Sequence, residues 1–528
     1  MDELYLKRGI QIEPLVDQWY AWSHLLSPAT AARNVTERHL RIMDSYIQAP
    51  EVHAAAVKNP RMLGGPFIDY GGGRVEEIRA LKQQTISQRQ SQVELSEALA
   101  QLNTLVQNEA RGYSLQSLYS KVPSALRGYV ELVYDLNNQP SYRLIEPLLF
   151  RSRFHDTSLQ SVMLSPTAGD DRPFALSTPR LGTSESLVVH TPFSDPSLDG
   201  LFRLSRKAST RQQIASLLAR WGCEEQLMSR YFGPEPPRQY EPYDGRGARW
   251  RYFGHACILV ETPLVNVLVD PVISYTYETD IPRYTYEDLP DIIDYVLITH
   301  NHQDHILFET LLQLRHKVRH IVVPKGGGSL QDPSLKWILL NAGFQNVIEL
   351  SEMEEMSLDG IDIVALPFMG EHSDLDIRSK TTYVVRVGRK GMMFAADTCN
   401  IEPTLYEHVH NALGDIDILF LGMECVGAPL TWLYGPLLTQ RLDREMDNSR
   451  RLSGSDCQQG MALVEAFGCR QVYIYAMGQE PWLNYVMSIK YTERSKPIVE
   501  SNRLIQECRS KGIVSERLFG EKEMLVEV

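Results

Sequence analysis

Apolar and polar positions follow a helical spacing through most of residues 13–110. The clearest helix is predicted over residues 74–108, where Leu95, Leu99 and Leu102 recur at offsets of four and three positions. This spacing places one apolar stripe along a helix. The stripe would either pack on its own domain or form the seam of a dimer, and the sequence leaves both open.

An extended pattern follows these helices. Short strands between Pro-, Gly- and Asp-rich turns are predicted at 128–134, 161–165, 173–177 and 185–190, and a helix at 210–230. This part contains no catalytic constellation and predicts a mixed α/β domain. Residues 233–242 are proline-rich and cannot sustain a helix or a central strand. We therefore expect an N-terminal domain over residues 1–235 and a C-terminal domain over residues 246–528.

The C-terminal part alternates predicted strands and helices. Strands are predicted at 249–254, 256–261, 265–270, 295–299, 321–324, 361–366, 382–387, 392–395, 416–423 and 471–475, and helices at 306–318, 330–342 and 455–467. This order fits two sheets with helices on their outer faces. The expected fold class is therefore α/β, with an αββα sandwich following a mixed α/β domain.

Composition narrows the functional classes. With 43% hydrophobic and 23% charged residues, the chain has the composition of a soluble globular protein, and 528 residues exceed one ordinary core. A net charge of −13 argues against a general nucleic-acid binder. The seven scattered cysteines form no CxxC pair, no signal-peptide pattern opens the sequence, and no apolar run approaches membrane-spanning length. We expect a cytoplasmic protein without nucleic-acid or membrane partners.

The densest chemistry lies in residues 295–305, with the sequence YVLITHNHQDH. An apolar strand ends there in four potential metal ligands: His300, His302, Asp304 and His305. Alternation along a strand lets His300 and His302 aim the same way, and the following turn lets Asp304 and His305 point at a second position. Imidazole and carboxylate at this density predict a site for two metal ions. A His-rich polar loop is the alternative.

Carboxylates at later strand ends are candidates for the remaining ligands. Glu371, Asp397 and Glu424 each follow a predicted strand. A single acid at a strand end is usually a turn former or a helix cap, but three in the domain that holds the motif favour ligation. Asp270 also ends a strand, and we expect it to orient a ligand histidine.

Residues 249–528 resemble the metallo-β-lactamase superfamily. The resemblance is carried by the 300–305 motif, by Gly370 with Glu371, and by the turn at residues 396–398. The family usually has a histidine where Glu371 stands, and His372 could replace Glu371 as the ligand by a shift of one position. It also usually supplies a last histidine from a late strand, whereas residues 472–478 contain none.

These departures favour iron. Carboxylates are harder and more anionic ligands than imidazoles, so they suit iron or manganese and stabilise the ferric state. A bridging carboxylate such as Asp397 would hold two metals roughly 3.5–4 Å apart, as in other two-metal sites. We therefore favour an oxygen-activating diiron centre over a dizinc site.

The chain as a whole resembles the diiron β-hydroxylases of non-ribosomal peptide biosynthesis, the chloramphenicol-pathway type, in size, in its N-terminal mixed domain and in its altered lactamase-like ligands. The resemblance implies a non-haem diiron monooxygenase of antibiotic biosynthesis. Such an enzyme uses O2 and an external electron-donor reductase to β-hydroxylate an amino acid. The substrate would be a thioester on the phosphopantetheine of a synthetase carrier domain.

The same resemblance implies the ligand set. His300, His302 and Glu371 would bind one iron, Asp304, His305 and Glu424 the other, and Asp397 would bridge. We expect a homodimer, with dimerisation and carrier docking in the N-terminal domain. One alternative is a dizinc hydrolase of the same fold that acts on a thioester, lactone or phosphodiester, and another is an assembly factor with structural metals.

The substrate surfaces are less defined. The loop at residues 274–286 contains four tyrosines and Arg283, and would line a channel or simply cover the sheet. The basic cluster of Arg203, Arg206, Lys207 and Arg211 would dock an acidic carrier or form a solvated face. The sequence leaves open whether the amino acid is aromatic or aliphatic.

Overall fold

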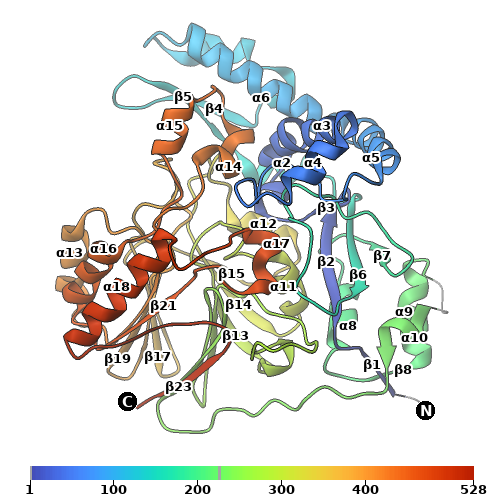
Figure 1. Cartoon of the computed structure of the whole chain (residues 1–528). Helices are drawn as coiled ribbons and strands as arrows, with labels where there is room; N and C mark the ends of the chain where they lie inside the picture. The colour runs from blue at the N-terminus through green and yellow to red at the C-terminus, as the bar shows by residue number, and fades with distance from the viewer. Residues whose placement is uncertain (1–2, 224–226, 528) are drawn as a thin grey trace.

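The computed structural model describes residues 3–223 and 227–527, and its strands fall into two groups along the chain (Figure 1). We refer to the described residues up to 233 as the N-terminal region and to residues 248–527 as the C-terminal region. Each sheet draws all its strands from one of these regions. The proline-rich connection, residues 234–247, contains no regular helix or strand.

The C-terminal region contains two seven-stranded sheets. The first has the order β15 (Val347–Leu350), β14 (Val318–Pro324), β13 (Ile293–Leu297), β12 (Asn266–Val269), β11 (Cys257–Glu261), β10 (Ala248–Gly254) and β23 (Lys522–Val526). The second has the order β16 (Glu355–Leu358), β17 (Ile361–Leu366), β18 (Thr382–Val387), β19 (Lys390–Phe394), β20 (Ile418–Gly422), β21 (Gln471–Tyr475) and β22 (Val514–Arg517). Strands β12–β15 run parallel, as do β19–β22.

Aromatic and branched side chains fill the space between the two sheets. Trp250 of the first sheet meets Phe420 of the second edge-on at 5.1 Å between ring centroids. Phe394 stacks on the same Phe420 ring at 5.0 Å. Strands buried on both faces explain why their sequences are almost continuously apolar.

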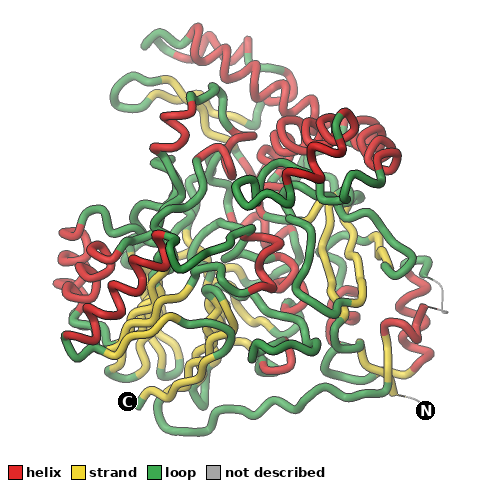
Figure 2. The backbone as a smooth tube through the Cα atoms, in the orientation of Figure 1, coloured by secondary structure: helices red, strands yellow, loops and turns green. Residues whose placement is uncertain are grey.

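Helices cover the outer faces of both sheets, as Figure 2 shows in red against yellow strands. The first sheet is covered by α11 (Phe308–Leu314) and α12 (Leu335–Asn341), and the second by α13 (Pro403–Leu413), α16 (Cys457–Phe467) and α18 (Lys496–Ser510). This arrangement confirms the predicted αββα sandwich. None of the described helices is long and apolar enough to cross a membrane.

The N-terminal region combines three small sheets with helices. Its main strands are β1 (Glu3–Leu6), β2 (Ile10–Val16), β3 (Trp19–Tyr20), β4 (Val130–Tyr134), β5 (Pro140–Leu144), β6 (Gln160–Pro166), β7 (Leu187–His190), β8 (Ser209–Thr210) and β9 (Phe232–Gly233). Its main helices are α2 (Pro28–Asn34), α3 (Leu40–Gln48), α4 (Pro50–Ala56), α5 (Val75–Gln88), α6 (Gln90–Glu109), α8 (Ser197–Arg203) and α9 (Arg211–Arg220). Figure 1 shows α6 and the β4–β5 hairpin extending outward from the body.

Several local predictions for this region were wrong. The helix predicted over 74–108 breaks at Arg89, whose buried guanidinium lies 3.4 Å from Asp17, and α5 and α6 lie on either side. No strand forms at 173–177, where the Ala175 N–H bonds to the Tyr485 carbonyl instead. The helix predicted at 210–230 ends at Arg220, and residues 224–226 of that prediction lie outside the described residues. Strand β2 also occupies a stretch predicted as helical.

The apolar stripe on α6 is buried within its own chain. Leu95, Leu99 and Leu102 are at most 2% exposed and belong to the large hydrophobic core. That core continues into α11 and α12 of the C-terminal region. The stripe is therefore used for packing, and any dimer must use other side chains.

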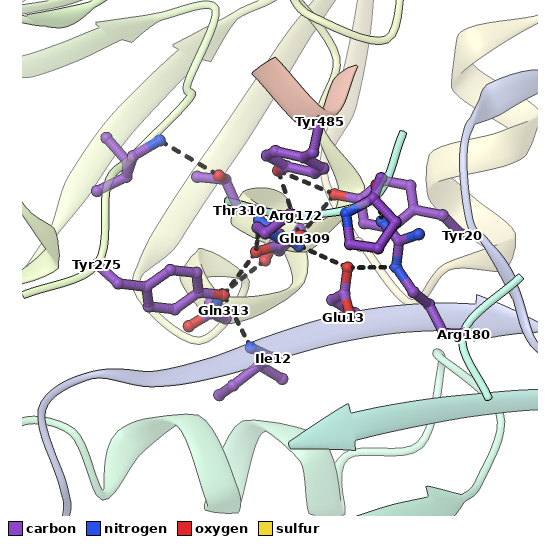
Figure 3. Close-up of polar contacts among 12 residues, drawn as sticks. Ile12, Glu13, Tyr20, Arg172, Arg180, Tyr275, Glu309, Thr310, Gln313 and Tyr485 are labelled. Atoms are coloured by element: carbon purple, nitrogen blue, oxygen red, sulfur yellow. Dashed lines mark hydrogen bonds and ion pairs between the residues drawn. The ribbon is translucent and has the colours of Figure 1, made fainter. Parts of the chain in front are cut away.

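A buried ionic cluster joins the two regions (Figure 3). Arg172 contacts Glu13 of β2 and Glu309 of α11, each at 2.7 Å, and Arg180 donates to Glu13 at 2.8 Å. Tyr20, Tyr275 and Tyr485 donate further hydrogen bonds to Glu309. Because α11 begins three residues after His305, this cluster holds the helix that follows the metal motif.

Candidate metal centre

The motif lies in the loop between β13 and α11, at the carboxyl end of a parallel strand. His300, His302, Asp304 and His305 are all at most 6% exposed. Carboxyl ends of parallel strands are where open α/β sheets commonly place ligand sites. The structure thus gathers the four predicted side chains in one buried place.

Three overlapping groups of ligand atoms surround this loop. The first contains His300, His302, Glu371 and His372, the second His300, His305 and Asp397, and the third His255, Asp304 and His305. Within each group the potential ligand atoms lie within 4.8 Å of one another. This geometry brings six of the seven predicted ligands into groups that could hold a metal ion.

His302 and Glu371 define the first group. The Nδ1 atom of His302 lies 3.1 Å from His300 Nε2 and 3.0 Å from Glu371 Oε1. Gly370 before Glu371 has a φ of +73°, and a Cβ there would lie 2.5 Å from Cys399 Cβ. Only glycine fits this close approach, so Gly370 sets the direction of Glu371. His372 Nδ1 lies 2.7 Å from Glu371 Oε2, and therefore both alternatives left by the sequence lie in the group.

Asp397 connects the second group. Its Oδ2 atom lies 3.2 Å from His305 Nε2 and 3.9 Å from His300 Nε2. His300 belongs to the first group as well, and His305 belongs to the third. This central position is what a bridging carboxylate requires.

Glu424 is the predicted ligand that belongs to none of the three groups. It lines the same cavity as His302, Asp304, Glu371 and Asp397, whose volume is about 400 Å³. Burial, reinforced by the Asp397, Asp304 and Glu371 carboxylates, raises the pKa of Glu424 well above its ordinary value.

Neighbouring side chains orient the imidazoles. Asp270 Oδ2 lies 2.8 Å from His305 Nδ1, which leaves His305 Nε2 facing Asp397. This contact agrees with the orienting role predicted for Asp270. Tyr434 OH lies 3.0 Å from His302 Nε2, and so Nδ1 is the atom that faces the group. Fixing one ring nitrogen of a ligand histidine through the other is a common feature of metal sites.

Two further residues contact the predicted ligands although the sequence assigned them no role at the metals. His255 Nε2 lies 3.1 Å from Asp304 Oδ2, and Tyr434 contacts His302. The only signal for His255 was its position after Gly254 at the end of a predicted strand. Tyr434, like Trp432, was a candidate from sequence only for lining the substrate channel, because its contact with His302 depends on how the 430–434 helix packs.

The electrostatics of the site suit cations. Burial alone would lower the pKa of His305, but the Asp397, Asp270 and Asp304 carboxylates raise it well above the ordinary value. Burial and the same crowding of carboxylates raise the pKa of Glu424, so the two shifts share a cause. Asp397 Oδ1 and His305 Nε2 are buried without any hydrogen-bond partner among the described residues. Metal ions displace protons from their ligands when they bind, and the residues present fit two of them.

The predicted substrate surfaces differ in outcome. The tyrosine loop packs against the N-terminal region, where Arg283 contacts Asp170 at 2.9 Å and Tyr275 joins the ionic cluster. It does not line the metal cavity. In the basic cluster, Arg206 donates to the Arg238 and Glu287 carbonyls and contacts Asp291. These contacts hold Arg206 in the fold.

Comparison with known proteins gives full-length matches. Residues 5–236 match the diiron non-heme β-hydroxylase N-terminal domain, and residues 265–432 match the β-lactamase superfamily domain. The 4-amino-L-phenylalanyl-[CmlP-peptidyl-carrier-protein] 3-hydroxylase of Streptomyces venezuelae is 42% identical over 97% of this chain and 98% of its own length.

Solved structures agree with this assignment. The crystal structure of CmlA, a diiron β-hydroxylase from Streptomyces venezuelae, superposes with a TM-score of 0.94 at 41% identity over 99% of both chains. A mutant of the CmlA β-hydroxylase superposes with a TM-score of 0.91 at 41% identity, over 99% of this chain and 100% of its own. The C-terminal sandwich and the N-terminal region therefore occur together as they do in these relatives, and the chain belongs to the diiron non-haem β-hydroxylase family.

Proposed function

We propose that this hydroxylase acts on the β-carbon of an amino acid held as a thioester on a carrier domain of a non-ribosomal peptide synthetase. O2 is the co-substrate, and an external reductase supplies the electrons. The observation that carries the proposal is the full-length match, at 42% identity, to a hydroxylase named for its aminoacyl carrier-protein substrate. The dizinc hydrolase alternative is less well supported, because the first group contains Glu371 and the late strand β21 offers no imidazole.

The same proposal assigns the ligands. His300, His302 and Glu371 would hold one iron, Asp304, His305 and Glu424 the other, and Asp397 would bridge them. Bound there, the irons would supply oxygen activation and removal of hydrogen from the β-carbon. The protein's own residues orient the ligands: Asp270 fixes His305, and Tyr434 fixes His302.

The cavity walls supply the substrate environment. Trp432, Met487 and Ile489 are apolar side chains that line the cavity together with the carboxylates. Apolar walls keep water from the reacting carbon and would accept the side chain of the amino acid. Gln303 of the motif donates to the Val486 carbonyl at 3.3 Å and so holds this wall against the metal loop.

The domain division and the partners complete the proposal. We assign residues 1–235 to dimerisation and carrier docking and residues 246–528 to catalysis. A homodimer is supported by the outward-extending β4–β5 hairpin and the segment before it, where Leu136 and Tyr113 are 103% and 83% exposed. Light scattering of wild type and Leu136→Asp would show whether these side chains carry the dimer.

All seven cysteines are free, which supports a reducing, cytoplasmic location.

The experiment that tests the function combines metal analysis with turnover. Purified protein should contain about two irons and, once chemically reduced, should add one oxygen atom from ¹⁸O2 to a carrier-bound amino acid, as read by mass spectrometry of the carrier. Turnover of a thioester without reductant in anaerobic buffer would instead establish the hydrolase. Zinc-only protein without oxygen dependence would also contradict the proposal.

A further inference from the structure

A second cavity lies next to the metal cavity and opens between the two regions. Its volume is about 620 Å³. Gly64, Pro429 and Trp432 line both cavities, so the two share a wall. Nothing in the ligand set or in the ionic cluster uses this second space.

Trp432 forms the central part of the shared wall. Its indole N–H donates to the Gly64 carbonyl at 2.9 Å, which links a C-terminal side chain to an N-terminal loop. Phe174 lies on the other side, at 6.1 Å between ring centroids and a tilt of 30°. Trp432 therefore spans the boundary between the two regions at the wall that both cavities share.

The charges of the two cavities differ. The metal cavity is lined by the carboxylates of Asp304, Glu371, Asp397 and Glu424 together with the guanidinium of Arg451. The second cavity is lined by the guanidiniums of Arg38 and Arg41 and by one carboxylate, Glu37. The second cavity therefore offers an anionic group cationic side chains that are not among the metal-binding groups.

Arg38 has donor capacity that the protein leaves unused. It donates to the Trp432 carbonyl at 2.8 Å and to the Leu433 carbonyl at 3.1 Å, but its Nη1 atom is buried without a partner among the described residues. Arg41, by contrast, is 63% exposed and pairs with Glu37. A buried unpaired donor has a free-energy cost unless an acceptor reaches it. An amide carbonyl or a phosphate oxygen in the cavity would satisfy it.

From these observations, and resting on the proposed function, we propose that the second cavity binds the phosphopantetheine arm and that the thioester reaches the metals past Trp432. The arm is long and thin, with amides along its length, an apolar dimethyl group and a phosphate at its outer end. Phe67, Phe174 and Leu176 offer apolar contact, and Ser177 and Arg38 offer polar contact. Exposed Arg41 marks the outer end, where the phosphate would lie, and the wall shared with the metal cavity at Trp432 marks the inner end, where the thioester would lie.

Gly435 allows the cavity to be filled without disturbing the fold. It lines the second cavity only, has a helical φ of −46°, and a Cβ there would meet only Thr431 Cβ at 3.5 Å. Gly435→Ala should leave room for the arm, whereas Gly435→Trp should fill the space. Gly200→Trp is the matched control, because Gly200 is also helical and a Cβ there meets nothing within 4 Å.

Binding of 4′-phosphopantetheine to the iron-loaded protein, measured by ligand-observed NMR, gives the first test. Wild type, Gly435→Ala and Gly200→Trp should bind alike, and Gly435→Trp should bind at least about tenfold more weakly. Absence of binding to wild type, or equal binding by Gly435→Trp, overturns the proposal. This readout needs no turnover, so loss of hydroxylation with retained binding would refute only the proposed function.

Photolabelling of the wild type tests the site without any variant. A pantetheine that carries a diazirine should label peptides containing residues 64–67, 174–177 and 429–436, as read by mass spectrometry. Labelling confined to the outer lip of the metal cavity, at Pro60, Val426 and Ile489, would mean that the arm enters directly from solvent. That result would refute the second cavity even if carrier-bound substrate is hydroxylated normally.

Discussion

The boundary between the regions and the metal cavity of the C-terminal region each bury a cluster of carboxylates, but the two have different partners. At the boundary, Glu13 and Glu309 face the guanidinium of Arg172 at 2.7 Å, and Arg180 supplies a second cation. In the metal cavity, the crowded carboxylates instead lie among imidazoles. Burial and these carboxylates raise the pKa of Glu424, and the carboxylates outweigh burial to raise that of His305, both well above their ordinary values. A cluster of carboxylates paired with guanidiniums serves the fold, whereas one grouped with imidazoles offers ligands to metal ions.

The largest effect is expected in the metal cavity, from a substitution of Asp397. Asp397→Ala removes the carboxylate that lies 3.2 Å from His305 and 3.9 Å from His300. Changing a residue behind a metal ligand already costs about 10–100-fold, so loss of a bridging ligand should reduce hydroxylation by more than about 100-fold. Iron content should fall as well, as measured by elemental analysis.

Asp415→Ala is the control, because the Asp415 side chain is 82% exposed and lies outside the metal groups. It should keep both irons and normal turnover. Two irons and wild-type turnover in Asp397→Ala would show that this carboxylate is not a ligand, and the contrast between the two clusters would fail.

At the boundary the expected loss is one of stability. Arg172→Met leaves Glu13 and Glu309, both at most 3% exposed, without their shared cation. Removing one partner of a buried ion pair costs about 3–5 kcal/mol in the free energy of unfolding. Denaturant unfolding followed by circular dichroism should show a loss of this size, while folded Arg172→Met should still bind iron.

Arg143→Met is the matched control. Arg143 pairs with Glu131 on the β4–β5 hairpin, but the two side chains are 60% and 48% exposed. A solvated pair of this kind contributes less than about 1 kcal/mol. Equal losses in both variants would mean that burial does not distinguish the pairs.

Acid should weaken the boundary cluster over a defined pH range. Burial alone would raise the pKa of Glu13, but Arg180 and Arg172 outweigh it and lower the pKa from 4.5 to about 2. Because the folded-state pKa is below the unfolded one, this stability is complete above about pH 4.5 and is lost as pH falls toward 2. The shift corresponds to about 3 kcal/mol. Glu13→Gln should flatten this part of the stability–pH curve, and an unchanged slope would contradict the assignment.

The sequence predicted the sandwich because its strands are short, apolar and separated by clear turn signals. It predicted the 300–305 motif because all four ligands lie within six residues. The break between α5 and α6 could not be predicted, because no glycine or proline marks it in the sequence. It coincides instead with the buried tertiary pair of Arg89 and Asp17. Tertiary contacts of this kind override local propensity.

Site residues that depend on packing were harder to predict. His255 reaches Asp304 from another strand end, 49 positions away in sequence. Glu371 and His372 are adjacent and both face His302, so sequence order alone could not choose between them. The contact between Tyr434 and His302 spans 132 positions and exists only because the 430–434 helix packs over the metal loop.

The smallest effect is expected from removing the contact between Tyr434 and His302. It tests whether a side chain beside the metal cavity serves metal binding or the fold. Tyr434→Phe removes the hydroxyl 3.0 Å from His302 Nε2 but retains the ring, so the fold should persist while the imidazole is less firmly oriented. Metal affinity should fall by about tenfold, as measured by competition with an iron chelator. Tyr46→Phe is the control: it also loses a buried hydroxyl, which donates to the Gly73 carbonyl at 2.6 Å in the N-terminal region. It should lower the thermal midpoint without changing iron affinity, and equal iron affinities for both variants would show that Tyr434 supports the fold rather than the metal centre.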